Sequence, residues 1–182
     1  FVDESGKETK LYISGDDIDG NGMVLVLNAD YSFNRVIKSF ENTITVNEAG
    51  KTKTIKKDRF GSVTNVFVDI NGGIYICDLN GANTSNVNYD VKGNVKDEAA
   101  GRVVKLNKKY ETEYVIAGGT SEILPKGFDF QPRKIVVDDY GRIFVLSKAN
   151  TMGIMEFDAA GDFIQCIGAP DVTYNMFELF WR

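Results

Sequence analysis

The residues best suited to chemistry form a short acidic run, Asp17-Ile18-Asp19-Gly20-Asn21-Gly22. Asp17, Asp19 and Asn21 alternate like the oxygen ligands at the start of an EF-hand calcium loop, and Gly22 stands at its sharp turn. The last position of such a loop falls on Asn28, where a bidentate glutamate is expected. We therefore favour a turn capped by Asp17 and keep calcium binding as the alternative.

Other reactive residue types are scarce in the chain. It contains no histidine, the commonest general base and a common metal ligand. Cys77 and Cys166 lie far apart and outside any metal-ligand spacing, so we expect buried free thiols and no disulfide. The paired acids Asp138 and Asp139 precede a turn glycine, and we expect Asp138 to accept backbone amides. We assign no catalytic, cofactor-binding or metal-binding residue and no cofactor.

A segment that occurs three times must position these residues. Each copy starts with an apolar pair and an aspartate, aligned on Val2, Val68 and Val137, and continues through a turn glycine into a second apolar run. Two further apolar runs follow in every copy, joined by Asn- or Asp-containing reversals. Four short strands in meander order form one blade of a β-propeller, so the sequence predicts an all-β chain with about three four-stranded antiparallel blades.

The repeat divides the chain into three blades, two insertions and a connecting segment. We place blade 1 at about 1–40, an inserted hairpin at 41–60, blade 2 at about 61–118 with a loop insertion at 80–100, blade 3 at about 132–168, and the connecting segment at 169–182. Because binding specificity often lies in loops on a rigid scaffold, the polar loop at 80–100 is the segment we first expect to touch a partner.

Three blades are too few for a ring, since propellers use about four to eight blades. We therefore expect part of a six-bladed ring and a fragment of a longer protein. A mature N-terminus at Phe1 and association of several three-blade arcs are the alternatives.

The charge and hydropathy patterns make two classes of partner unfavourable for this chain. A net charge of −5 disfavours nucleic acid, which requires a basic footprint. The basic run at 51–57 alternates like a strand and predicts a hairpin with a solvated lysine edge. No apolar run approaches the length of a transmembrane helix, so we expect membrane association only through regions outside this chain.

The repeated motifs resemble the NHL-type β-propellers. The segments 69–79, 101–106, 132–145 and 153–158 carry the apolar-Val-Asp, turn-glycine and Arg-Ile-x-Val patterns of that family. The match is similar to a bacterial group found largely in Firmicutes, whose members often continue into a Yip-type membrane domain. The departures are the two insertions and the segment 22–24, which stands where blade 1 should carry Arg-Ile.

The resemblance implies a non-enzymatic binding or scaffold propeller that presents loops to a protein or glycan partner at the bacterial cell surface. It therefore implies an extracytoplasmic location. The alternative is a metal-dependent, lactonase-like hydrolase with its site in the central channel or outside this chain. Convergent acids or amides on the first strand of each blade would favour the enzyme, and the sequence offers Asn65 and little else.

Overall fold

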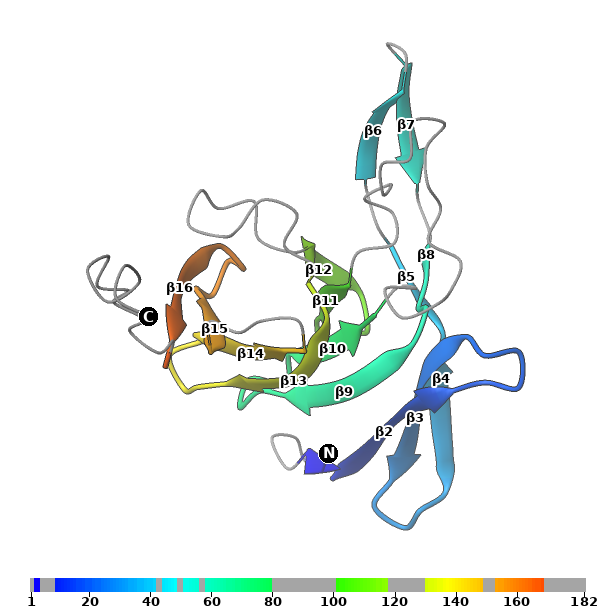
Figure 1. Ribbon diagram of the computed structural model, residues 1–182. Coiled ribbons are helices and arrows are strands. Elements are labelled where there is room, and N and C mark those ends of the chain that lie inside the picture. Colours follow the sequence, from blue (N-terminus) through cyan, green and yellow to red (C-terminus); the bar gives the residue numbers. More distant parts are fainter. Residues whose placement is uncertain are drawn as a thin grey trace, which may run out of the picture.

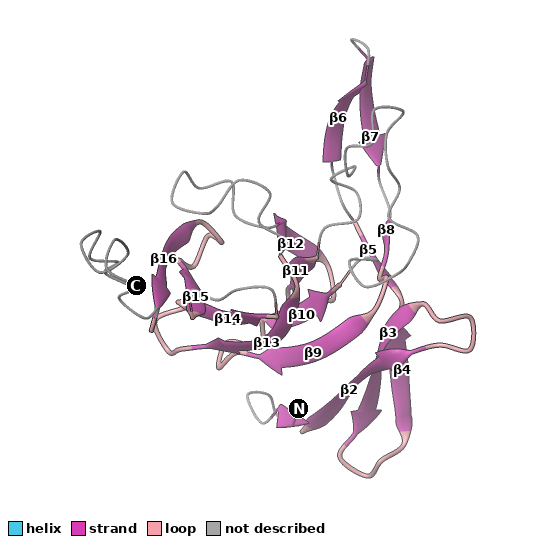
Figure 2. Cartoon of the chain, viewed as in Figure 1, coloured by secondary structure: helices cyan, strands magenta, loops and turns pink. Residues whose placement is uncertain are grey.

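The computed structural model describes residues 2–3, 9–41, 44–48, 51–55, 58–79, 101–117, 130–148 and 153–168. These residues form strands and turns without a helix, so the prediction of an all-β chain is confirmed over this part (Figure 1, Figure 2). The predicted loop insertion at 80–100 and the connecting segment at 169–182 lie outside the described residues. No described helix could cross a membrane.

Twelve of the strands form three antiparallel sheets, each with four strands in chain order. Sheet I consists of β1 (Val2–Asp3), β2 (Lys10–Asp16), β3 (Gly22–Asn28) and β4 (Phe33–Ile37). Sheet II consists of β9 (Val63–Val68), β10 (Ile74–Asp78), β11 (Arg102–Leu106) and β12 (Thr112–Ala117). Sheet III consists of β13 (Pro132–Val137), β14 (Ile143–Ser147), β15 (Ile154–Phe157) and β16 (Phe163–Ile167).

Two small strand pairs lie between sheets I and II in the sequence. β5 (Ser39–Phe40) pairs with β8 (Asp58–Arg59), and β6 (Ile44–Glu48) pairs with β7 (Lys51–Ile55) between them. The β6–β7 hairpin projects away from the three large sheets (Figure 1). The Phe40 and Phe60 rings lie 5.1 Å apart and pack together at its base.

One tight turn recurs in the three sheets, at 17–21, 28–32, 69–73, 107–111, 138–142 and 158–162. The first residue donates its amide to the carbonyl of the fifth, and the fourth donates to the carbonyl of the first. The fourth residue has a positive φ, which suits glycine; Tyr31 (64°) and Tyr110 (67°) occupy this position in two turns. In five of the turns the Oδ1 atom of the first residue accepts the amides of the third and fifth residues.

The sheets pack face to face in chain order, with sheet II between the other two (Figure 1). Successive side chains of a strand point to opposite faces of the sheet. We call the face that a sheet turns toward the preceding sheet its front face and the opposite one its back face; in sheet I, the front face is the one opposite sheet II. The back face of sheet I meets the front face of sheet II in one core, whose members include Tyr12, Val24, Val26, Ile74, Ile76 and Val104. The back face of sheet II meets the front face of sheet III in another, which includes Tyr75, Cys77, Val103, Ile143, Val145 and Met155.

The first strands of sheets II and III are joined by two hydrogen bonds. The Thr64 hydroxyl donates to the Pro132 carbonyl at 2.8 Å, and the Asn65 Oδ1 accepts the Ile135 amide at 3.0 Å. These bonds hold β9 beside β13, so sheets II and III are closest to each other at their first strands.

Candidate functional site

A hollow of about 380 Å³ lies at the edge of sheet II that carries the turns 69–73 and 107–111. The β10–β11 register sets Ile74 opposite Leu106, which brings the two turns side by side. Gly72 has a φ of 79°, and a Cβ built there would lie 3.1 Å from the Lys108 side chain. The side chain of Lys108 therefore lies against Gly72 and links the two turns.

The lining of this hollow is polar and carries both signs of charge. It contains three acids, three lysines, two amides and a glycine: Asp69, Glu111, Glu113, Lys105, Lys108, Lys109, Asn71, Asn107 and Gly73. A Cβ built at Gly73 would lie 2.6 Å from the Asp69 Oδ2, so this position requires glycine for the carboxylate to turn back over its own loop. The lining thus offers hydrogen-bond donors and acceptors on opposite turns.

Lys105 is the cation most firmly held in the lining. Its Nζ lies 3.0 Å from the Glu113 Oε2, and 5.3 Å and 5.1 Å from the ring centroids of Tyr75 and Tyr114. Burial lowers the pKa of Lys105, but the hydrogen bond to Glu113 and the neighbouring Tyr114, Glu113 and Asp69 outweigh burial and raise its pKa overall. The lysine stays protonated at neutral pH, which suits it to binding an anion or a carbonyl and not to nucleophilic attack.

Two tyrosines form the support behind Lys105. The Tyr75 hydroxyl donates to the Asp69 Oδ2 at 3.3 Å, and the Tyr114 hydroxyl donates to the Ala159 carbonyl of sheet III at 3.0 Å. Burial raises the pKa of both phenols, with Asp69 adding to the rise at Tyr75. Both hydroxyls therefore remain neutral donors, and the second one ties the site to the neighbouring sheet.

No protein-family model matches the chain, and a search of curated proteins finds no match either. The geometry of the described residues is therefore the basis for the functional argument.

The acidic run that begins at Asp17 forms a capped turn. The Asp17 Oδ1 accepts the amides of Asp19 at 3.1 Å and Asn21 at 2.9 Å, and its Oδ2 accepts the Lys38 Nζ at 3.1 Å. The Asn21 amide, then Lys38, lower the pKa of Asp17 to about 2. Both carboxylate oxygens are thus engaged by the protein, as the turn interpretation predicted. Among the residues that the structure describes, no group of three or more His, Cys, Asp or Glu side chains could hold a metal ion.

The other predicted positions also have structural contacts. The Asp138 Oδ1 accepts the amides of Tyr140 and Arg142, so its predicted role in a turn is confirmed. Cys77 and Cys166 are both thiols; Cys77 is buried, as expected, whereas Cys166 is only half-buried. Burial raises the pKa of the Cys77 thiol, which makes it a poor nucleophile.

A second charged cluster, at the opposite end of β11 from Lys105, escaped the sequence reasoning. Arg102 is almost fully buried; it donates through Nε to the Asp78 Oδ2 at 2.9 Å, through a second nitrogen to Asp58, and through a third to the Arg59 carbonyl at 2.7 Å. The Asp78 Oδ1 accepts the amides of Gly61 at 2.9 Å and Ser62 at 3.0 Å. This cluster fixes the β5–β8 pair to sheet II, and we assign it a structural role.

Proposed function

We propose that the chain is a non-enzymatic binding module that presents the turn edge of sheet II to a protein or glycan partner. The observation that carries the proposal is the hollow of about 380 Å³, in which acids, amides and lysines from two adjoining turns and from β11 and β12 converge. Glycans and polar peptide segments both bind through arrays of such donors and acceptors. The recurring turn holds these groups on a rigid sheet, which reduces the entropic cost of binding.

The finer architecture that we propose is three blades of an NHL-type β-propeller, part of a six-bladed ring. Three features support it: four-stranded meanders, face-to-face stacking in chain order, and adjacent first strands in sheets II and III. With the NHL resemblance, the same architecture is the basis for proposing an extracytoplasmic, cell-surface location in a bacterium.

The ionisation of the described groups supports binding over catalysis. General acid–base or nucleophilic work at neutral pH requires groups whose pKa is brought close to neutrality. The pKa of Lys105, Tyr75, Tyr114 and Cys77 moves upward instead, away from neutrality. Asn65, the amide that could have served a channel site, accepts the Ile135 amide. No observation on the described residues favours the lactonase-like alternative.

The experiment is to probe arrays of immobilised bacterial glycans and of peptides with the labelled chain. We expect a defined subset to bind, and the double variant Lys108→Glu/Lys109→Glu to lower the affinity for that subset by about tenfold or more, since each tenfold step corresponds to ~1.4 kcal/mol. Lys148→Glu, an exposed lysine outside the hollow, is the matched control and should bind like the original chain. Equal binding by the double variant would exclude the hollow as the site.

A further inference from the structure

The front face of sheet I is apolar, and no described residue covers it. The strand registers align Leu11 with Leu27 and Phe33, and Ile13 with Leu25 and Val36, so six apolar residues lie together on it. Ile13 is 48% exposed and Phe33 is 66% exposed. In sheet II, Ile76 is the equivalent of Ile13 and Ile74 is the equivalent of Leu11; they are buried at 0% and 1% because sheet I covers them. The front face of sheet I therefore has the character of an interior surface.

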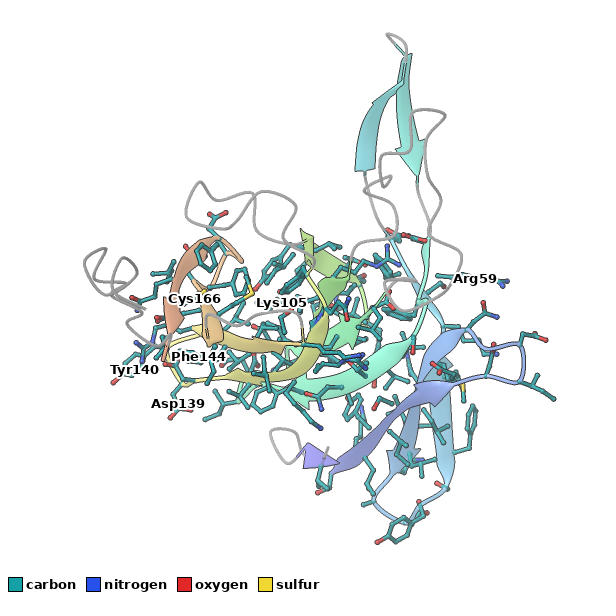
Figure 3. The ribbon with its side chains drawn as sticks, viewed as in Figure 1. Arg59, Lys105, Asp139, Tyr140, Phe144 and Cys166 are labelled. Atoms are coloured by element: carbon teal, nitrogen blue, oxygen red, sulfur yellow. The ribbon has the colours of Figure 1, made fainter. Side chains whose placement is uncertain are left out.

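Among the described residues, none covers the back face of sheet III either. Val136, Leu146, Ile154 and Ile167 are exposed along it, and the β13–β14 register sets Phe144, which is labelled in Figure 3, beside Val136 on the same face. Its central acid is Glu156, which is buried in its own sheet.

The negative charge of Glu156 on this back face is compatible with another sheet packing over it. The Glu156 Oε2 accepts the Gln165 Nε2 at 2.7 Å, and the Glu156 Oε1 lies 3.6 Å from an Arg142 nitrogen. In sheet II, Lys105 occupies the corresponding register position and is likewise paired within its own sheet, to Glu113. Sheet III packs against that face of sheet II, so the fold already covers one back face that carries a paired central charge.

The contact between sheets I and II and the contact between sheets II and III share one feature. In each, the fourth residue of the turn between the third and fourth strands lies against an equivalent residue on the fourth strand of the preceding sheet. In sheet II, Tyr110 is the fourth residue of the turn between the third and fourth strands, and the Arg35 guanidinium of sheet I lies 3.9 Å from its ring centroid. In sheet III, Gly161 is the equivalent turn residue, and a Cβ built there would lie 3.1 Å from the Tyr114 ring of sheet II. Arg35 and Tyr114 occupy matching positions on the fourth strand, and Gln165 is the matching residue of sheet III.

Tyr31 is the equivalent turn residue of sheet I. It is 73% exposed and has a φ of 64°, a conformation that is uncommon for a non-glycine residue. Tyr110 adopts the same conformation and is packed against the preceding sheet. Tyr31 thus shares the backbone conformation of Tyr110, which contacts a neighbouring sheet, but its own ring is exposed.

We propose that the front face of sheet I binds the back face of sheet III of a second copy of this chain, head to tail, with Tyr31 lying over Gln165 of that copy. Each copy offers one face of each kind, so two copies satisfy both and can close by two-fold symmetry. The association would repeat the back-to-front packing that joins sheet I to sheet II and sheet II to sheet III. It does not depend on the proposed ligand-binding function.

Light scattering on the chain after size-exclusion chromatography, over a range of concentrations, tests this inference. We expect a particle of about twice 20.2 kDa. Ile13→Asp should weaken the association at least about tenfold, whereas Ile18→Asp, a fully exposed isoleucine at the tip of turn 17–21, should leave it unchanged.

A variant that does not disturb folding completes the test. Tyr31→Gly removes the ring and suits the positive φ, so the monomer should be at least as stable while the association weakens. A monomer at every concentration would overturn the proposal and leave the two faces to another partner. A dimer that is insensitive to both Ile13→Asp and Tyr31→Gly would overturn it too.

Discussion

Arg102 and Lys105 stand three positions apart on β11, yet their surroundings differ completely. Arg102 is enclosed by Asp78, Asp58 and a backbone carbonyl, and its guanidinium lies 4.6 Å from the Phe40 ring centroid. Lys105 has one anionic partner and two aromatic neighbours, and it lines an open hollow. A cation engaged by protein groups on every side is a structural element, whereas one with an open side can meet a ligand.

Replacement of Arg102 should have the largest effect. Arg102→Met leaves Asp78 buried without its cation, and losing one partner of a buried ion pair costs about 3–5 kcal/mol. Chemical denaturation followed by circular dichroism measures this free energy of unfolding. Lys38→Met is the control, because the ion pair of that exposed lysine with Asp17 should contribute about 1 kcal/mol or less. Equal losses in the two variants would remove the distinction between a buried and an exposed cation.

Replacement of Lys105 should have a small effect on stability and a larger one on binding. Methionine keeps the packing against Tyr75 and Tyr114, and the pair with Glu113 is partly exposed, so Lys105→Met should cost about 1 kcal/mol or less. Its affinity for a glycan or peptide found on the arrays should fall about tenfold. Calorimetric titration and thermal unfolding of the same sample separate the two readouts. A large stability loss with unchanged affinity would place Lys105 among the structural cations.

Asp17 should give the smallest effect, and it appears only in acid. Its pKa in the folded protein is about 2 against an ordinary value of 3.8, so its contribution to stability is present above about pH 3.8 and is lost as the pH falls toward 2. Asp17→Asn keeps the oxygen that accepts the Asp19 and Asn21 amides but cannot titrate. Thermal midpoints at pH 7 and pH 2.5 should therefore differ less in the variant. An unchanged difference would mean that Asp17 titrates normally.

The strands and most turns could be predicted from the sequence because their signals are local. Alternating apolar residues and an Asp-x-x-Gly reversal specify a strand pair and its turn within a dozen residues. Asp69 and Asp138 behave in this way, each followed by the glycine that adopts a positive φ. Tyr31 and Tyr110 break the pattern, since nothing local requires tyrosine in that conformation and only the neighbouring sheet explains Tyr110.

The charged clusters could not be predicted because they depend on contacts between distant segments. Arg102 on β11 meets Asp58 on β8, and no spacing in the sequence marks that pairing. The hollow arises because two turns of one sheet become neighbours, although neither turn differs from the other copies in its backbone. The role of Asn65 could not be predicted either, because the Ile135 amide that it accepts lies 70 positions away on β13.

The pairing of β5 with β8 has a consequence for how the chain tolerates change. Strand hydrogen bonds, the Phe40 and Phe60 rings, and the contacts of Arg102 with Asp58 and Arg59 hold the two ends of the inserted segment together. Whatever sequence joins those ends meets anchor points that are already set, and the entropy of closing a loop rises only slowly with its length. The segment between them is therefore exchangeable: it could be shortened, lengthened or replaced by an unrelated peptide while the three sheets keep their arrangement.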